Sequence, residues 1–144
     1  MIVLESALNL GLIRVADVQD IVASIPEERR GFLSLLNRAE SGSETRVRLF
    51  LQRRHVTVSP QVYLPGIGRV DLLVGRRLIV ECDSAEYHSS PEQRRLDYAR
   101  DLAARDQGFD HLRLDYHQIW HQWGSTQESL LREIRRDRHR RPPR

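Results

Sequence analysis

Two apolar runs, residues 69–74 and 78–83, constrain the fold of this chain most strongly, because only the Gly-Arg-Arg loop at 75–77 separates them. Both runs are rich in valine, leucine and isoleucine, and a three-residue loop with glycine is typical of a β-hairpin. In that hairpin Val74 faces Leu78. Strands this apolar are expected at the centre of a sheet with both faces covered.

The periodicity of the remaining sequence predicts an α/β fold around this hairpin. The predicted elements are helices within 3–40, a helix from 41 to 54, an irregular strand at 56–64 interrupted at Pro60, the two hairpin strands, a helix at 92–107 ended by Gly108, a strand at 110–116 and a last helix opened by a capping box at 125–128. A helix between the last two strands predicts a parallel crossover, and hence a mixed sheet in an α/β sandwich. Helical spacing places Leu96, Ala99, Leu102 and Ala103 toward that sheet.

Composition excludes several classes of chemistry. All 23 basic residues are arginine, so a Schiff-base lysine, a Walker lysine and a lysine general base are excluded. One cysteine excludes a disulfide framework and a cysteine-rich zinc site. No apolar run approaches the roughly 20 residues of a membrane span, and the first residues lack the pattern of a signal peptide. We expect a soluble cytoplasmic protein without a membrane partner.

The net charge of +3 arises at the C-terminal end. From Arg132 onward there are seven arginines and two acids, whereas the rest of the chain is slightly acidic. Two interpretations remain open for this tail. It is either a frayed, solvated helix end closed by Pro142 and Pro143, or a segment that binds phosphates or an acidic partner.

Three acids in the hairpin point to a functional site. Asp71 lies opposite Glu81, and Asp83 follows on the same strand. Strand alternation places Asp71, Leu73, Ile79, Glu81 and Asp83 on one face, and Val70, Leu72, Val74, Leu78, Val80 and Cys82 on the other.

Like charges opposite each other destabilise a sheet, so these acids need neutralisation. Arginine partners are one solution, with Arg46, Arg69 and Arg113 as candidates; a raised pKa and a divalent cation are the others. Oxygen ligands without a Cys/His cluster favour Mg²⁺ or Mn²⁺.

At these residues the chain resembles the PD-(D/E)xK nuclease superfamily, in its very-short-patch-repair-like branch, which includes uncharacterised actinobacterial proteins. The residues that carry the resemblance are, in order, Ser43-Glu44-Thr45-Arg46, Arg69-Val70-Asp71, Val80-Glu81-Cys82-Asp83, Tyr87-His88, Arg94 to Asp97 with Arg100, and Gly108-Phe109 before Leu112-Arg113-Leu114. The resemblance implies a restriction-endonuclease-like α-β-β-β-α-β core at 41–122, preceded by a helical segment at 1–40 and followed by a C-terminal helix and arginine-rich tail at 123–144.

The resemblance also implies roles for individual residues. Glu44, Asp71 and Glu81, with the main-chain carbonyl of Cys82, would bind Mg²⁺ or Mn²⁺ for DNA hydrolysis. For Glu44 a second interpretation stays open, because Ser41 to Glu44 is itself a capping box at a helix start.

Asp83 stands where the superfamily most often has lysine. The very-short-patch branch lacks that lysine and has a histidine near the site, so His88 becomes the candidate for proton transfer. We therefore take Asp71, Glu81, Asp83 and His88 as candidate catalytic residues.

The expected function is a metal-dependent DNA endonuclease. DNA contacts are expected from the arginines Arg69, Arg94, Arg95, Arg135 and Arg136. A homodimer, or a partner protein that supplies targeting, is the expected assembly. One alternative is an inactive nuclease-fold protein that binds DNA or regulates a partner, as an antitoxin does. Another is an RNase or an RNA-binding protein. The low aromatic content of 6% argues against single-strand stacking.

Overall fold

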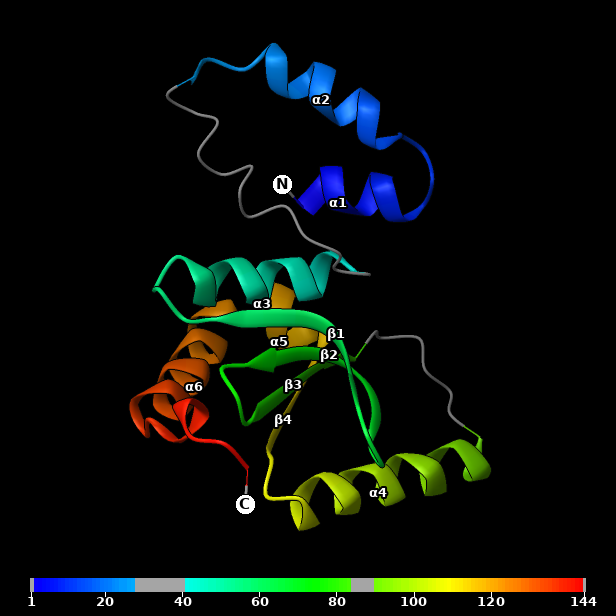
Figure 1. Cartoon of the computed structure of the whole chain (residues 1–144), viewed down its shortest axis with the longest axis vertical. Helices are drawn as coiled ribbons and strands as arrows, with labels where there is room; N and C mark the ends of the chain where they lie inside the picture. The colour runs from blue at the N-terminus through cyan, green and yellow to red at the C-terminus, as the bar shows by residue number, and fades with distance from the viewer. Residues whose placement is uncertain (1, 28–40, 84–89, 144) are drawn as a thin grey trace.

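The computed structural model describes residues 2–27, 41–83 and 90–143 and shows an α/β protein with one four-stranded mixed sheet (Figure 1). Its elements are α1 (Ile2–Asn9), α2 (Val15–Ala23), α3 (Gly42–Gln52), β1 (Val58–Leu64), β2 (Gly68–Val74), β3 (Leu78–Asp83), α4 (Pro91–Asp106), β4 (Asp110–Asp115), α5 (Tyr116–Trp120), α6 (Trp123–Arg135) and a 3₁₀ turn, η2 (Arg138–Arg140). Within the described ranges, none of the helices has both the length and the apolar character needed to cross a membrane.

The sheet has the order β1-β2-β3-β4. The first three strands are antiparallel, and β4 runs parallel to β3 after the α4 crossover. The predicted hairpin register is confirmed, because Val74 pairs with Leu78 and Leu72 with Val80. Both apolar strands are therefore interior strands of the sheet, as their composition predicted.

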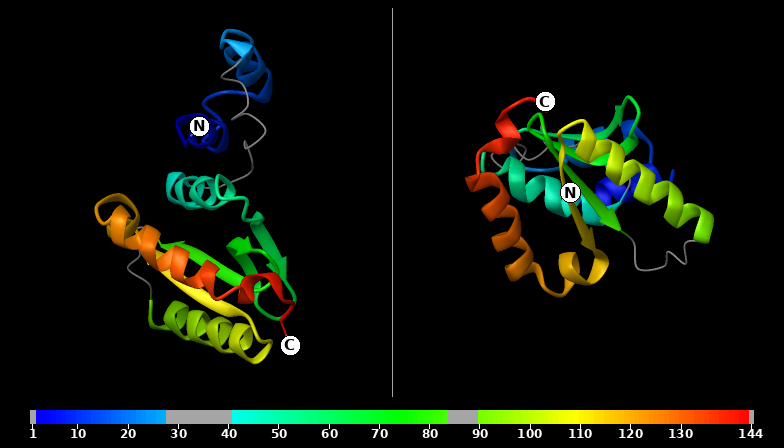
Figure 2. Two further views of the ribbon diagram at one scale, coloured as in Figure 1. Left: turned by 90° about the vertical axis from the view of Figure 1, so that its left-hand side faces the viewer. Right: turned by 90° about the horizontal axis from the view of Figure 1, so that it is seen from below.

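Helices cover both faces of the sheet and make a three-layered molecule (Figures 1 and 2). One core lies between the sheet and α3, α5 and α6, with Leu51, Val80 and Ile119 at its centre. A smaller core lies under α4 and contains Ile79 and Ala104. Helix α1 contacts α3 on the side away from the sheet.

Val70 was predicted on the same face of the sheet as Leu72, and this is wrong. The alternation of side chains between the two faces is broken at the row of Gln61 and Asp71. Val70 packs in the α4-side core with Ile79, whereas Leu72 lies in the α3-side core. The cause of this break is local. Gln61 on β1 has φ +53, in the left-handed region, and it lies between the β1–β2 pairs on either side of Asp71. The strand predicted to break at Pro60 instead continues through that proline, which an edge strand tolerates.

The predicted sheet-facing side of α4 is only partly right. Ala103 packs in the core under α4, as predicted, but Ala99 is exposed and Leu96 and Leu102 are each 59% exposed, whereas Ala104 is 1% exposed. Small alanines allow the helix to approach the sheet closely, and Arg100 extends over the edge of β2 to bond the carbonyl oxygens of Ile67 and Arg69. Arg100 is thus on the side of α4 that faces the sheet, and Leu96 and Leu102 are left exposed to solvent.

The end of the chain contains a short helix that the sequence did not predict. Asp115 caps α5 by accepting a hydrogen bond from the Gln118 N–H. Helix α6 then begins at Trp123, so the predicted start at Ser125 is wrong; Ser125 lies inside the helix and donates its hydroxyl to the Gln122 carbonyl.

The C-terminal tail is docked, which corrects the interpretation as a frayed end. His139 is 4% exposed, and its carbonyl oxygen accepts a hydrogen bond from the Arg76 N–H at 2.7 Å. Arg138 pairs with Asp110 at 2.9 Å, the same acid that pairs with Arg77. The tail therefore closes over the β2–β3 loop.

The docking of the tail predicts that Gly75→Ala destabilises the protein by roughly 2–3 kcal/mol. Gly75 has φ +63, and an added Cβ would overlap the carbonyl oxygen of His139. Gly11→Ala is the matched control, because Gly11 has φ +66 and nothing within 4 Å of the added Cβ. It should cost about 1 kcal/mol from backbone strain alone. Urea unfolding of both variants measures the difference, and equal destabilisation would contradict the docked tail.

Candidate functional site: a carboxylate cluster between β2, β3 and α3

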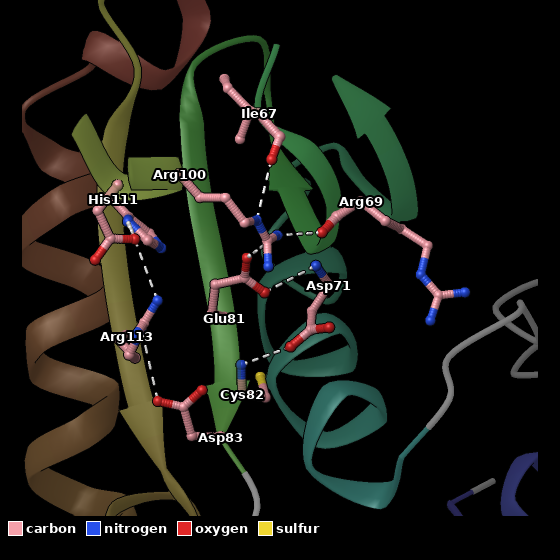
Figure 3. Close-up of polar contacts among 10 residues, drawn as sticks. Ile67, Arg69, Asp71, Glu81, Cys82, Asp83, Arg100, His111 and Arg113 are labelled. Atoms are coloured by element: carbon pink, nitrogen blue, oxygen red, sulfur yellow. Dashed lines mark hydrogen bonds and ion pairs between the residues drawn. The ribbon is translucent and has the colours of Figure 1, made fainter. Parts of the chain in front are cut away.

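Asp71 and Glu81 bridge β2 and β3 just beyond the last ladder pair, Leu72 with Val80 (Figure 3). The Asp71 N–H donates to Glu81 Oε2 at 3.1 Å, and the Cys82 N–H donates to Asp71 Oδ2 at 2.8 Å. Each carboxylate thus accepts a backbone hydrogen bond from the opposite strand. These two hydrogen bonds tie the side chains of Asp71 and Glu81 across the β2–β3 pair, where the predicted register places these residues opposite each other.

Glu44 approaches the cluster from the first turn of α3. Its N–H donates to the Ser41 side chain at 3.2 Å, so the predicted cap at Ser41 is present. The Glu44 carboxylate is nearly buried, at 4% exposure, and accepts a hydrogen bond from Gln61 Nε2 at 2.8 Å. The Ser41 half of the predicted capping box is therefore present, whereas the Glu44 side chain bonds Gln61 at the sheet, where its role as a metal ligand stays a prediction.

Gln61 belongs to this site, although sequence reasoning did not select it. Its left-handed backbone lies in the row of Asp71, and its amide joins the cluster through Glu44. The Gln61 Oε1 atom is buried and has no hydrogen-bond partner among the described residues. A glutamine in an irregular edge strand gives no recognisable pattern, so only the fold places it here.

All four described acids that the sequence selected lie within electrostatic reach of one atom. The pKa of the Cys82 thiol is raised well above its usual range, first by burial and then by the charges of Asp71, Glu44, Glu81 and Asp83. The charges of these acids thus all reach the end of β3, where Cys82 lies.

Arg100 is the arginine that meets Glu81, at 3.5 Å from its Oε1 atom. Burial and the Asp71 charge nevertheless raise the pKa of Glu81 to about 7, and Arg100 only partly opposes this rise. Arg100 was not among the predicted neutralising partners. It is distant in sequence, and it reaches Glu81 because α4 presents this side of the helix to the sheet.

A second ion-pair chain begins at Asp83. Arg113, one of the predicted partners, lies 3.6 Å from Asp83 and 3.2 Å from Asp101, which also contacts His111 at 3.2 Å. Burial raises the pKa of Asp83 in spite of Arg113, and burial likewise lowers the pKa of His111. Arg46, another predicted partner, instead stacks on tryptophan rings.

The remaining candidates are not gathered into one surface. His88 lies outside the described residues. The DNA-contact candidates are exposed on three elements, namely Arg69 on β2, Arg94 and Arg95 on α4, and Arg135 and Arg136 on α6. Because α4 and α6 cover opposite faces of the sheet, these arginines form at least two separate surfaces (Figure 1).

The cluster offers only oxygen donors to a cation. Mg²⁺ and Mn²⁺ prefer oxygen ligands. The candidate ligands are two carboxylates from neighbouring strands, a third from α3 and the main-chain carbonyl of Cys82. In the part of the chain that the structure describes, no three Asp, Glu, His or Cys side chains have the arrangement of metal ligands. Asp71 Oδ2 and Glu81 Oε2 are instead engaged with backbone N–H groups.

Known proteins give no further guide to the roles of these residues. Comparison of the chain with protein-family models, with curated proteins and with solved structures finds no match. The function must therefore be inferred from the chemistry of the cluster itself.

The raised pKa of Glu81 predicts a pH-dependent effect of Glu81→Gln in metal-free buffer. The folded pKa of about 7 exceeds the ordinary value of 4.5, so ionisation of Glu81 costs stability as the pH rises through this window. Glutamine keeps the acceptor for the Asp71 N–H but carries no charge. Relative to wild type, we expect Glu81→Gln to gain about 1 kcal/mol between pH 5 and pH 8.

Thermal or urea unfolding at several pH values measures this gain. Glu128→Gln is the control, since Glu128 is exposed on α6 and the same substitution there should shift stability little at any pH. A constant difference between Glu81→Gln and wild type would show that Glu81 does not titrate in this window.

Proposed function

We propose that the protein is a small metal-dependent endonuclease that hydrolyses DNA phosphodiester bonds at the carboxylate cluster. The observation that carries the proposal is the reciprocal bonding of Asp71 and Glu81 between neighbouring strands. The buried Glu44 adds a third carboxylate whose charge, like those of Asp71 and Glu81, reaches the Cys82 thiol. Such a concentration of like charge suits a site for a divalent cation.

The order of elements supports a restriction-endonuclease-like core. From α3 to β4 the chain runs α-β-β-β-α-β, and the first three strands are antiparallel while the fourth is parallel to the third. The resemblance to the PD-(D/E)xK superfamily implies this order. It also implies acids at the start of the helix and on the second and third strands, where Glu44, Asp71 and Glu81 lie.

Asp71, Glu81, Glu44 and the Cys82 carbonyl are the groups that would hold Mg²⁺ or Mn²⁺. A bound cation would supply charge stabilisation at the scissile phosphate and a lower pKa for an attacking water. Gln61 orients the Glu44 carboxylate through its 2.8 Å hydrogen bond. Arg100 limits repulsion at Glu81 and fixes the start of β2 through two carbonyl oxygens.

Asp83 and His88 complete the proposal for proton transfer. Asp83 occupies the place of the usual lysine and is held by Arg113, so we assign it to orientation of the site. His88 is the proton-transfer candidate that the family resemblance implies. The chain has no lysine that could take this role.

A second candidate function is a nuclease-fold protein that binds DNA or a partner without cleaving. The ion pairs of Glu81 with Arg100 and of Asp83 with Arg113 favour it, because arginines can neutralise these acids without a cation. The two functions differ in their response to metal.

Asp71→Asn provides the direct test of the nuclease. Asparagine can still accept the Cys82 N–H, so the hairpin should keep its structure while the cluster loses a charge. We expect plasmid cleavage with Mg²⁺ or Mn²⁺ to fall by about 10²-fold or more. We also expect loss of the wild-type stabilisation by Mn²⁺, which is about 2.7 kcal/mol at a hundredfold excess over the dissociation constant.

Asp106→Asn is the matched control, since Asp106 is exposed at the end of α4 and makes no ion pair with another described residue. It should cleave and bind Mn²⁺ as wild type does. Metal-dependent cleavage that survives Asp71→Asn would refute the assigned site. A wild type that ignores Mn²⁺ but binds DNA would establish the second function.

The proposed DNA contacts on α4 predict an effect on salt dependence. Replacing Arg94 and Arg95 together by glutamine should weaken binding to duplexes of any sequence. The slope of log affinity against log salt should become shallower by about one for each phosphate that the variant no longer neutralises. Fluorescence anisotropy measures both quantities, and the double variant at Arg135 and Arg136 tests α6 in the same way. An unchanged slope in one variant would exclude that surface.

A further inference from the structure

A second candidate binding site lies between α1, α3 and α6. Here a cavity of about 600 Å³ is lined by Arg46 of α3 and by Arg53 and Arg54, which directly follow that helix, together with Phe50, Trp123 and Gln127. No acidic side chain of the described residues lines it. We call this cavity the arginine pocket.

Arg46 is held rigidly at the arginine pocket. Its guanidinium lies 4.8 Å from the ring centroid of Trp120 and 4.7 Å from that of Trp123. Trp120 is itself fixed, because its indole N–H donates to Ser43 Oγ at 2.9 Å. Within the described chain Arg46 makes cation–π contacts but no hydrogen bond or ion pair, so its N–H donors remain available for a ligand.

The other two arginines add charge at the C-terminal end of the helix. Arg53 is the C-cap of α3, and Arg54 lies in the turn directly after it. Arg54 lies 3.8 Å from the centroid of Phe50 and donates to its carbonyl oxygen, and both Arg53 and Arg54 are exposed. The dipole of α3 favours cations at its C-terminal end, but Arg46 lies near the middle of the helix and gains little from it.

We propose that the arginine pocket binds a small organic phosphate of about the size of a mononucleotide. Guanidinium groups match phosphate oxygens with two parallel hydrogen bonds, and a guanidinium held on aromatic rings loses little entropy on binding. A volume of about 600 Å³ is typical of small-molecule sites and exceeds what a phosphate ion fills. Leu49 and the rings of Phe50 and Trp123 supply an apolar wall for the organic part.

The arginine pocket is separate from the carboxylate cluster. Glu44 and Arg46 are two residues apart on α3, and this spacing directs their side chains to nearly opposite sides of a helix. Glu44 faces Gln61 at the sheet, whereas Arg46 faces the cavity. The proposal therefore does not depend on nuclease activity.

The tryptophans provide the readout, because both tryptophans of the chain contact Arg46. The full chain is titrated with adenosine 5′-monophosphate, with adenosine and with inorganic phosphate. Indole fluorescence is excited where adenine does not absorb, and calorimetry repeats the measurement. We expect a saturable response to the nucleotide, with adenosine and inorganic phosphate each binding at least tenfold more weakly.

Four variants assign the response to the pocket. Arg46→Gln should weaken nucleotide binding at least tenfold. Arg53→Gln should also weaken it. This variant covers the case in which loss of Arg46 unfolds the protein, because Arg53 is exposed and its side chain makes no hydrogen bond or ion pair with another described residue. Arg76→Gln is the matched control, since Arg76 is an exposed arginine of the β2–β3 loop that does not line the pocket, and this variant should bind as wild type does. Asp71→Asn should also bind normally, which separates this test from that of the nuclease.

Several outcomes would overturn the proposal. No saturable response to the nucleotide, or adenosine binding as tightly as the nucleotide, would exclude phosphate recognition. Inorganic phosphate binding as tightly as the nucleotide would exclude an organic ligand. Unchanged nucleotide binding in Arg53→Gln, or in a folded Arg46→Gln, would place the site elsewhere.

Discussion

The exchange of hydrogen bonds between β2 and β3 is the interaction on which the rest of the site depends. Where the regular ladder stops, the carboxylates of Asp71 and Glu81 accept the N–H groups of Cys82 and Asp71, respectively. The acids thereby continue the pairing of two strands that form the centre of the sheet. The same bonds place two negative charges face to face in a partly buried position, where they repel each other more strongly than in water.

The structure limits this repulsion from the α4 side of the sheet, where Arg100 meets Glu81. On the α3 side, Glu44 adds a further buried carboxylate, whose partner is Gln61. Burial and the Asp71 charge together hold the pKa of Glu81 at about 7 even with Arg100 beside it. A site of this kind has excess negative charge that a cation can relieve, which connects the stability of the hairpin to the proposed function.

Helix α3 joins two sites of opposite charge. One side of the helix carries the Glu44 carboxylate to the sheet, and the other carries Arg46 to a cavity that no described acid lines. Arg53 and Arg54, directly after the helix, line the same cavity. The pairing of Arg46 with two tryptophans keeps its charge away from the carboxylates that it was predicted to neutralise. Arg100 and Arg113 meet those acids instead, because they lie on the α4 side of the sheet.

The sequence by itself determined the hairpin, its register and the position of Asp71 opposite Glu81, because side-chain alternation and a short loop are local properties. It also determined the α4 crossover and the cap at Ser41. Only the tertiary structure decided the change of pleat at Gln61, the rotation of α4 that leaves Leu96 and Leu102 exposed, and the docking of His139 on the β2–β3 loop. These features depend on contacts between segments far apart in the chain. The energies of such contacts cannot be read from the local pattern of apolar and polar residues.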